Sequence, residues 1–286
     1  MEGWLVINSF MENDKFKHLY EMLLSAFAKR DVILKMKKAS DLSLEVGEII
    51  KEKPAFIIFW DKDIYLAERL EEMGFRLFNN KEAIALCDNK ILMYQKLEAA
   101  NIRIPRTFIA PKTFTGLGYN DLSFLKKVSK EIGYPMVIKE AYGSFGEQVY
   151  LASDEKEAIN IIKNINDKDF LMQEYIASSK GRDVRLNVVG GKVIVSMLRE
   201  NQNDFRSNIS SGGKGHLYEP DEDFKKMAIK ACEALNLDFA GVDIMFDKNQ
   251  RPILCEVNSN PQFASTLKAT GVDLSNYIAD YILDNL

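Results

Sequence analysis

The residues with the clearest potential for chemistry are two carboxylates and one amide on a predicted β-hairpin between residues 239 and 263. Two stretches of alternating character flank a polar turn at residues 248–251, a pattern typical of a hairpin. Symmetric pairing about this turn places Asp243 opposite Glu256. Two residues further along the same face, Asn258 lies opposite Gly241. Opposed carboxylates about 5 Å apart repel each other, so a cation between them is expected.

The chemistry of these donors favours a hard divalent cation. Three oxygen ligands without His or Cys suit Mg²⁺, with Mn²⁺ as an alternative. A solvated face on an ordinary hairpin is the competing interpretation, but Met245 and Leu254 are predicted on the same face and favour a cleft. The other face is predicted to be apolar, with Val242 facing Val257, Ile244 facing Cys255 and Phe246 facing Ile253.

The composition is that of a soluble globular protein. The chain has 286 residues, 47% hydrophobic and 28% charged, enough for two or three packed units. A net charge of −4 argues against a nucleic-acid surface as the main purpose. Cys87, Cys232 and Cys255 have neither metal-ligand spacing nor an even count, and indicate reduced thiols and a cytoplasmic setting. Only His18 and His216 are available for triads or His-ligated zinc. No signal peptide or membrane-spanning run is expected.

The first 80 residues alternate strand and helix patterns. Strands are predicted over 4–7, 32–36 and 55–60, and helices over 14–30, 40–53 and 64–73. This βαβαβ order predicts a small parallel-sheet domain that holds substrate or forms scaffold. The first strand is not followed by a G-x-G-x-x-G sequence, so the dinucleotide fingerprint is missing.

A glycine-bearing loop at residues 141–146 lies between predicted strands 136–139 and 148–152. With Lys139 just before it, the loop can present backbone N–H groups and an ammonium to phosphate oxygens. It is not a Walker loop, because it returns in a strand and lacks G-K-[ST]. A simple hairpin turn is the alternative. Upstream, Asp88 is predicted to cap a helix over 89–100, and residues 101–120 form a compositional boundary before a helix at 122–132.

The second half of the chain adds further strands and cations. A helix is predicted over 155–164, a strand over 170–176, a long hairpin turning at residues 190–191, and helices over 221–236 and 272–286. Arg185, Arg199 and Arg206 lie in sequence between the glycine-bearing loop and the acidic hairpin. Taken singly, each is expected to be a surface group.

Read together, six segments between residues 173 and 275 resemble the ATP-grasp superfamily, and within it the RimK-like glutamate ligases. They are QEYI, KGRDVRLNVVGGKV, DFRSN, AGVDI, EVNSNP and TGVDL, in the family's order and approximate spacing. The resemblance implies a mixed α/β and α+β chain, an ATP-grasp fold preceded by a small Rossmann-like parallel-sheet domain. The expected units are 1–84, 85–172 with the lid and glycine-bearing loop, and 173–286 with the metal site.

The resemblance also implies roles for individual residues. ATP would bind between two α+β subdomains, with two Mg²⁺ ions expected. The implied ATP-binding residues are Lys90, Lys139, Gly143, Ser144 and Gly146 around the phosphates, Glu174, Tyr175 and Ile176 at the adenine, and Asp183 at the ribose. The implied metal ligands are Asp243, Glu256 and Asn258, and the implied catalytic residues are Arg199, Arg206 and Asn208.

The implied activity is an ATP-dependent carboxylate–amine ligase that forms an amide through an acyl phosphate. An amino acid such as glutamate would be added to a protein, peptide or small-molecule acceptor, and relatives of this kind are often dimers or tetramers. A kinase on the same scaffold and a non-catalytic ATP-binding regulator are the alternatives. Two departures from the family pattern, residues 61–63 (DKD) and 210–211 (SS), fall where the substrate would be recognised.

Overall fold

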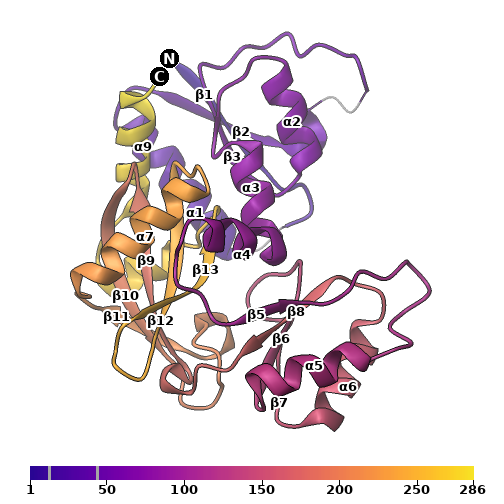
Figure 1. The fold of residues 1–286 in the computed structure, drawn as a ribbon. Coiled ribbons are helices and arrows are strands. Elements are labelled where there is room, and N and C mark those ends of the chain that lie inside the picture. Colours follow the sequence, from indigo (N-terminus) through magenta and orange to yellow (C-terminus); the bar gives the residue numbers. More distant parts are fainter. Residues whose placement is uncertain (12–13, 43–44) are drawn as a thin grey trace.

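The computed structural model describes residues 1–11, 14–42 and 45–286, and the strands in these ranges form three sheets (Figure 1). We call them the N-terminal sheet, the outer sheet and the central sheet. The central sheet has five strands and the other two have four each. The outer sheet protrudes at the lower right of Figure 1, whereas both chain termini lie together at the top of the view.

The N-terminal sheet is parallel, as predicted. Its strands are β1 (Glu2–Ile7), β2 (Ile33–Lys38), β3 (Ile57–Trp60) and β4 (Leu77–Phe78), in the order β2-β1-β3-β4. Helix α1 (Asp14–Ala28) joins β1 to β2, and α2 (Ile64–Glu72) joins β3 to β4. Leu5 and Ile7 pack on the α1 side, while Trp4 and Val6 pack on the α2 side. This alternation explains why the short strands read as buried on both faces.

The helix predicted over residues 40–53 is wrong for the described residues. A single 3₁₀ turn, η1, spans Ala39–Asp41, and residues 45–53 contain no helix. Residues 43 and 44 of the predicted helix lie outside the described part of the chain. Gly47 has a φ of 95°, in the left-handed region, which interrupts any right-handed helix through this segment.

The outer sheet is antiparallel and carries two helices on one face. Its strands are β5 (Thr107–Ile109), β6 (Met136–Glu140), β7 (Val149–Ala152) and β8 (Phe170–Glu174), in the order β5-β8-β6-β7. Helices α5 (Ser123–Ile132) and α6 (Glu155–Ile165) bury Leu125 and Ile162 against Phe170 and Met172. The predicted strand–loop–strand unit around residues 141–146 is therefore present as β6 and β7.

The central sheet is antiparallel and is covered on one face by α7 (Glu222–Ala234). Its strands are β9 (Arg182–Val189), β10 (Lys192–Glu200), β11 (Lys214–Leu217), β12 (Phe239–Phe246) and β13 (Pro252–Asn258), in the order β11-β10-β9-β12-β13. Phe224 and Ala228 of α7 pack on Leu186 and Val242. Helix α4 (Lys90–Ala99) adds Leu97 to the same core.

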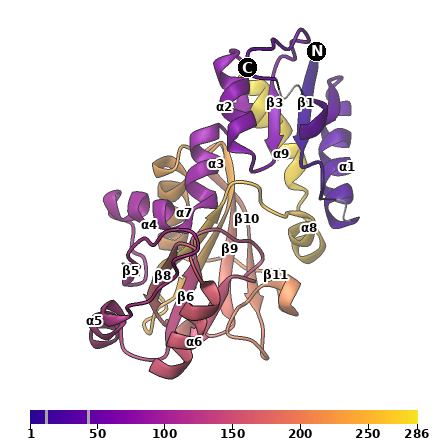
Figure 2. The same cartoon turned by 90° about the vertical axis from the view of Figure 1, so that its right-hand side faces the viewer.

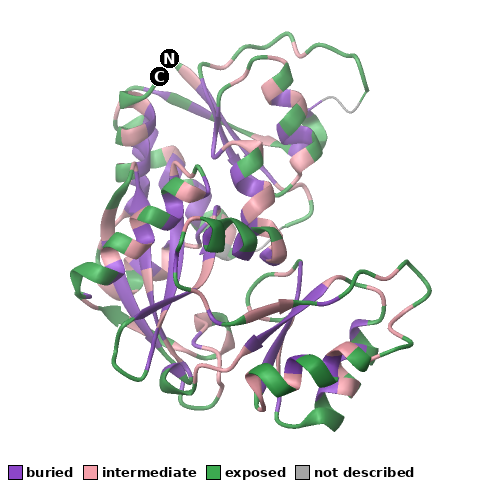
Figure 3. Ribbon diagram, in the orientation of Figure 1, coloured by how far each residue is buried: buried purple, intermediate pink, exposed green. Residues whose placement is uncertain are grey.

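The N-terminal sheet is joined to the central sheet by a continuous core. Trp60 at the end of β3 stacks on Phe239 of β12 with ring centroids 5.5 Å apart. Helix α9 (Leu274–Asp284) packs against α1 and contributes Ile278 to this core. Figure 3 shows buried residues running through both sheets, while the outer faces of the helices are exposed. No helix in the described ranges is long and apolar enough to cross a membrane.

Two short helices were not predicted, and one predicted cap is wrong. Helix α3 (Lys81–Asp88) begins after Asn80, whose side chain accepts a hydrogen bond from the Ala83 amide. Asp88 therefore ends α3, and the cap of α4 is Asn89, which accepts from two backbone amides. Helix α8 (Ala264–Thr270) lies before the last helix and was not predicted. The last helix, α9, begins at Leu274, whereas the predicted helix begins at residue 272. Each missed helix spans about two turns, too short for a clear period.

The register of the acidic hairpin is partly as predicted. Asp243 pairs with Glu256 and Gly241 pairs with Asn258. Beyond Asp243 the register shifts by one residue, so Ile244 faces Leu254, Met245 faces Ile253 and Phe246 faces Pro252. The predicted partners of Ile244 and Phe246 are therefore wrong, and Leu254 lies in the core rather than on the acidic face. An extra residue at Cys255 produces this β-bulge.

Candidate functional site

The site is built on the face of the central sheet that α7 leaves uncovered, which we call the site face. Along β9, Val184 and Leu186 point into the core under α7. Asp183 and Arg185 alternate with them and so belong to the opposite face. On β12 the same alternation places Asp243 on the site face. Period-two alternation alone therefore gathers charged groups from adjacent strands.

Two arginines hold two aspartates on the site face. Arg199 on β10 pairs with Asp183 and donates to both of its carboxylate oxygens, at 2.7 and 2.5 Å. The same guanidinium lies 2.9 Å from Asp243, and Arg185 donates two further hydrogen bonds of 2.7 Å to Asp243. Burial by itself raises the pKa of Asp243, but the two arginines outweigh burial and hold this pKa below its ordinary value. Asp243 is therefore ionised at neutral pH, and the Asp183 carboxylate is paired with the Arg199 guanidinium.

The three predicted metal ligands share the site face but differ in their surroundings. Arginines compensate Asp243, so its repulsion from Glu256 is relieved without a cation between the two carboxylates. Glu256 has 29% of its side chain exposed, and its Oε1 lies 3.7 Å from the Lys90 ammonium. Asn258 donates to the Gly241 carbonyl at 3.4 Å, which leaves its own oxygen for a ligand.

The donor chemistry of Glu256 and Asn258 fits a hard divalent ion such as Mg²⁺. Asp243 lies directly across the ladder from Glu256 and would add a third oxygen only if one of its arginine contacts were released. No group of three or more His, Cys, Asp and Glu in the described ranges has a metal-binding arrangement. The amide of Asn258 is therefore an essential member of any three-ligand set here.

A cavity of about 100 Å³ lies between the outer sheet and the site face. Lys139 of β6 enters it and donates to the Tyr94 hydroxyl at 2.9 Å. That hydroxyl in turn donates to the Cys255 carbonyl in the β-bulge. The chain of hydrogen bonds fixes an ammonium group that is only 7% exposed, beside the acidic hairpin. A buried, oriented cation of this kind is suited to a phosphate oxygen.

Lys90 provides a second cation at the same cavity. It is the first residue of α4, and its ammonium donates to the Gly143 carbonyl at 3.0 Å. Burial lowers the pKa of Lys90, the neighbouring Lys139 lowers it further, and Glu256 opposes both effects. The two lysines thus repel each other beside a carboxylate, and an anion bound between them would relieve that repulsion.

The remaining wall of the small cavity includes the segment that follows β8. Glu174, Tyr175 and Ile176 line it, and Glu174 is held in place by the Arg106 amide, which donates to its carboxylate at 2.9 Å. Asp183 lines the same cavity while bonded to Arg199. These contacts bring the predicted adenine and ribose residues to one cavity with the two lysines.

The glycine-bearing loop between β6 and β7 contributes Gly146 to the wall of the small cavity. Gly146 has a φ of 77°, and a Cβ there would lie 3.1 Å from the Asn208 side-chain oxygen. Arg206 donates to the Gly146 carbonyl at 2.5 Å, so the loop is tied to the segment after β10. On the other side, the Lys62 ammonium donates to Ser144 at 3.1 Å. The loop is therefore tied to the central sheet and to the N-terminal domain at once.

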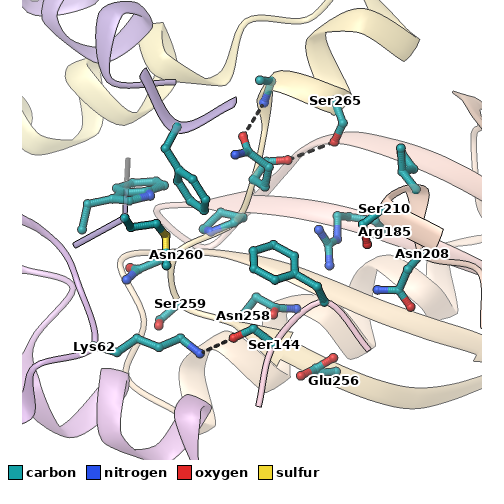
Figure 4. Close-up of a pocket in the computed structure, with 18 of the residues that line it drawn as sticks. Lys62, Ser144, Arg185, Asn208, Ser210, Glu256, Asn258, Ser259, Asn260 and Ser265 are labelled. Carbon is teal, nitrogen blue, oxygen red and sulfur yellow. Dashed lines mark hydrogen bonds between the residues drawn. The ribbon is translucent and has the colours of Figure 1, made fainter. Parts of the chain in front are cut away.

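A larger cavity of about 940 Å³ lies between the N-terminal sheet and the site face. Its walls include the ends of β1 and β3, the loop at 143–147 and the segment 258–268. Figure 4 shows Glu256, Asn258, Ser259 and Asn260 along the end of β13 and beyond it, with Lys62 bonded to Ser144 beside them. Glu256 and Asn208 line both cavities, so the two spaces meet at these side chains.

The structure brings nearly all the predicted site residues to these two cavities. The small cavity is lined by Lys90, Lys139, Gly146, Glu174, Tyr175, Ile176, Asp183 and Arg206, the large one by Gly143, Ser144, Arg199 and Asn258, and both by Asn208 and Glu256. Asp243 lines neither and is only 3% exposed. Arg199 is also 3% exposed, so the expectation that it is a surface group is wrong.

Sequence reasoning missed several groups that the structure places in the site. Tyr94 lies one turn after Lys90 on α4, so helical spacing could have flagged it once Lys90 was singled out. Asp61 and Asn260 line the large cavity from segments 199 residues apart in the chain. No local pattern in either segment points to the other.

Comparison with known proteins agrees with this geometry. Residues 87–282 match the model of the RimK-like ATP-grasp domain. The chain is 34% identical over 256 residues to beta-citrylglutamate synthase B of Danio rerio, covering 86% of this chain and 62% of that protein. It is 34% identical over 223 residues to a probable alpha-L-glutamate ligase of Picosynechococcus, covering 77% of this chain and 71% of the relative.

Among solved structures, a RimK domain ATP-grasp protein from Sphaerobacter thermophilus superposes with a TM-score of 0.76 at 20% identity, over 98% of this chain and 99% of that one. The likeness extends across all three sheets and shows the ATP-grasp fold. The chain spans less than two thirds of the length of the Danio rerio relative. With the domain match and these relatives together, the chain belongs to the RimK-like ATP-grasp family.

Proposed function

We propose that this chain is an ATP-dependent carboxylate–amine ligase. The observation that carries the proposal is the meeting of two cavities at Glu256 and Asn208. One cavity is narrow and holds two buried lysines, which suits a nucleotide and its phosphates. The other has about 940 Å³, room for two further small substrates or the end of a larger one. A ligase of this class needs both compartments to share one reacting phosphate.

In this proposal ATP binds at the small cavity, whose volume of about 100 Å³ is below the roughly 300–1,000 Å³ of ligand pockets, so the loop at 143–146 has to move away from the site face to admit the nucleotide. Glu174, Tyr175 and Ile176 face the adenine, Asp183 takes the ribose hydroxyls, and the ammonium groups of Lys90 and Lys139 bind phosphate oxygens. The loop from Gly143 to Gly146 lies over the phosphates and excludes water. The tie between Arg206 and the Gly146 carbonyl would keep that loop closed during the reaction.

Mg²⁺ is proposed to bind at Glu256 and Asn258, with Asp243 as the third ligand, and Mn²⁺ is an alternative. When bound, the metal would neutralise charge on the terminal phosphates. Two Mg²⁺ ions are proposed on the basis of the family resemblance, and Glu256 would help to hold them. Lys90 is 3.7 Å from Glu256, so the lysine is placed to share in the same charge neutralisation.

The proposed reaction has two steps. A carboxylate oxygen of the acceptor attacks the γ-phosphorus, and ADP leaves with the electrons of the broken P–O bond. The nitrogen of an amine then attacks the acyl carbon, phosphate leaves, and the amine loses its proton as the amide forms. Asn208 lies where the two cavities meet and Arg206 lines the small one, and both would stabilise the oxygens that carry charge in the two steps.

Arg199 takes a positioning role in this proposal rather than the direct catalytic role expected from sequence. Its guanidinium is bonded to Asp183 and Asp243, which places the proposed ribose and metal carboxylates relative to each other. We also propose that the chain works as the units 1–84, 85–172 and 173–286, the first of them binding substrate. The two relatives named above carry glutamate in their names, and glutamate is the amine we propose for this chain.

The test is ADP release with ATP, Mg²⁺, each of the twenty amino acids, and citrate, N-acetylaspartate or a peptide as the acceptor. Amide formation is then read from the product mass. Glu256→Gln is expected to suppress ADP release by at least about a hundredfold while the circular dichroism spectrum is unchanged. Glu131→Gln, a surface carboxylate paired with Arg106, is the matched control and should leave turnover intact.

Each alternative predicts a different outcome of the same experiment. A phosphorylated acceptor without an amide would indicate a kinase on this scaffold. ATP binding without ADP release for any substrate pair would indicate a regulator. Equal turnover in wild type and Glu256→Gln would remove the proposed metal site.

A further inference from the structure

The carboxyl end of the N-terminal sheet forms one wall of the large cavity. In the strand order β2-β1-β3-β4, the chain runs from β1 to β2 on one side of β1 and then returns to β3 on the other side of β1. The strand order therefore reverses between β1 and β3. In open parallel sheets, ligands bind in the crevice outside the carboxyl ends of the strands at such a point. Asn8 follows β1 and Asp61 follows β3, and both line the cavity. In Figure 2 the arrowhead of β3 points toward the other two sheets.

Asp61 is a buried carboxylate with one oxygen left over. It is 6% exposed, and its Oδ1 accepts from the Asn8 side chain at 3.0 Å and from the Lys62 amide at 2.7 Å. Within the described ranges its Oδ2 is buried and has no hydrogen-bond partner. Among the described residues Asp61 has no ion-pair partner, because the adjacent Lys62 is committed to Asp88 at 2.5 Å. A buried carboxylate oxygen without a donor or cation is costly and calls for a ligand.

Asn260 presents a second oxygen from the opposite wall. Its Nδ2 donates to the backbone carbonyl of Asp61 at 3.0 Å, which fixes the orientation of the amide. Its Oδ1 is buried and likewise has no partner in the described part of the chain. Tyr20 of α1 lines the same cavity, and the charge of Asp61 contributes to raising the pKa of its hydroxyl, after the larger effect of burial. Two oxygen acceptors on neighbouring segments, one of them charged, match a donor-rich cation rather than an anion.

The position of Asp61 and Asn260 near the proposed metal ligands indicates which kind of cation they bind. Asn260 lies two residues after Asn258, a proposed metal ligand, so at most about 7 Å of chain separates them. The third unpartnered polar group, the Trp60 indole N–H, lines the cavity beside Asp61 and can donate to a carboxylate. An ammonium acceptor site and a carboxylate donor in one wall together fit an α-amino acid.

We propose that Asp61, with Asn260, binds the ammonium group of the amino-acid substrate and so positions its nitrogen, which attacks after losing one proton to solvent, next to the reacting phosphate. This inference rests on the proposed ligase function and deepens it by naming the amine subsite. Burial and the charge of Asp63 raise the pKa of Asp61, and a bound ammonium would reverse that effect. Asp61 belongs to the DKD segment at 61–63, where the chain departs from the family pattern.

The test separates recognition of the amine from turnover. Asp61→Asn keeps the shape and the acceptor of the Asn8 hydrogen bond but removes the charge. Asp154→Asn is the matched control, because Asp154 is the N-cap of α6 and lines neither cavity, and Asn caps helices equally well. The KM for the amino acid is expected to rise roughly ten- to hundredfold in Asp61→Asn and to be unchanged in Asp154→Asn, with the KM for ATP the same in all three proteins.

A binding measurement keeps the inference decidable if no turnover is found. Thermal shifts of the nucleotide-free protein are recorded with each of the twenty amino acids and with the matching 2-hydroxy acids, in which a hydroxyl replaces the ammonium. Stabilisation of the wild type by an amino acid but not by its hydroxy analogue, lost in Asp61→Asn, supports the site. Absence of stabilisation by any amino acid, or equal stabilisation of Asp61→Asn, would overturn it and assign the unpaired oxygens to bound water.

Discussion

The sharpest structural prediction concerns Arg199, whose guanidinium is enclosed between Asp183 and Asp243. Arg199 is 3% exposed and Asp183 is 7% exposed. In Arg199→Met, Asp243 keeps both hydrogen bonds from Arg185, but Asp183 loses its two side-chain hydrogen bonds and its cation. Removing one partner of a buried ion pair costs about 3–5 kcal/mol, because the remaining charge is left uncompensated. The free energy of unfolding of an ordinary protein is about 5–15 kcal/mol, so a loss of this size should make the variant markedly less stable.

The assay is urea unfolding followed by far-ultraviolet circular dichroism, for Arg199→Met, Asp183→Asn and the double variant. If an uncompensated Asp183 carboxylate is the cause, the double variant should recover at least about 2 kcal/mol relative to the sum of the single losses. Arg206→Met is the matched control. Its ion pair with Asp204 is partly exposed, with side chains 27% and 22% accessible, so a loss of about 1 kcal/mol or less is expected.

Two results would refute this reasoning about Arg199. The first is a loss below about 1 kcal/mol in Arg199→Met, which would mean that the pair adds nothing beyond a surface contact. The second is strict additivity in the double variant, which would show that Asp183 does not depend on Arg199 for its charge compensation.

Three further predictions follow from the site. Tyr94→Phe removes the hydroxyl that links Lys139 to the β-bulge, so it should cost about 1–3 kcal/mol in urea unfolding and weaken ATP binding in calorimetric titration. Chelation of divalent ions should abolish ADP release, Mn²⁺ should restore part of it, and Glu256→Gln should not respond to either, as measured by a coupled ADP assay. For Asp61 the folded-state pKa lies above the ordinary value of 3.8, so the ionised carboxylate destabilises the ligand-free protein above the raised pKa and this penalty disappears as pH falls to 3.8. As pH is lowered from above the raised pKa to 3.8, the free energy of unfolding of the wild type should therefore increase relative to that of Asp61→Asn by about 1.4 kcal/mol for each unit of the pKa shift. A difference in unfolding free energy between the two proteins that does not change with pH would contradict the assignment.

The hairpin at the centre of the site shows which strand faces can be predicted from the two-residue period of side chains and which cannot. Side chains on a strand alternate with a period of two, so the shared face of Asp243, Glu256 and Asn258 follows from local spacing. The same count failed beyond Asp243, because the extra residue at Cys255 makes a bulge that leaves no mark in the pattern of residue types. Leu254 was consequently assigned to the wrong face.

Short helices and caps were the other failures, for a related reason. Two turns of helix, as in α3 and α8, give too few repeats for the 3.6-residue period to stand out. Asp88 and Asn89 are both good N-cap residues, and only the preceding helix decides which of them caps α4. Local propensity left that choice open.

By itself the sequence determined the parallel N-terminal sheet and most strands of the other two sheets, because these depend on periodicity, whereas the short strands β4, β5 and β11 were not predicted. The residues named for the site came largely from the family motifs, and most of them line the two cavities. Only the tertiary structure decided which charges compensate one another. The partners of Asp243 are arginines from two other strands, and the Asn260 side chain donates to the Asp61 backbone carbonyl across 199 residues of chain. Contacts of that kind arise when sheets pack together, and the spacing of residues along the chain does not encode them.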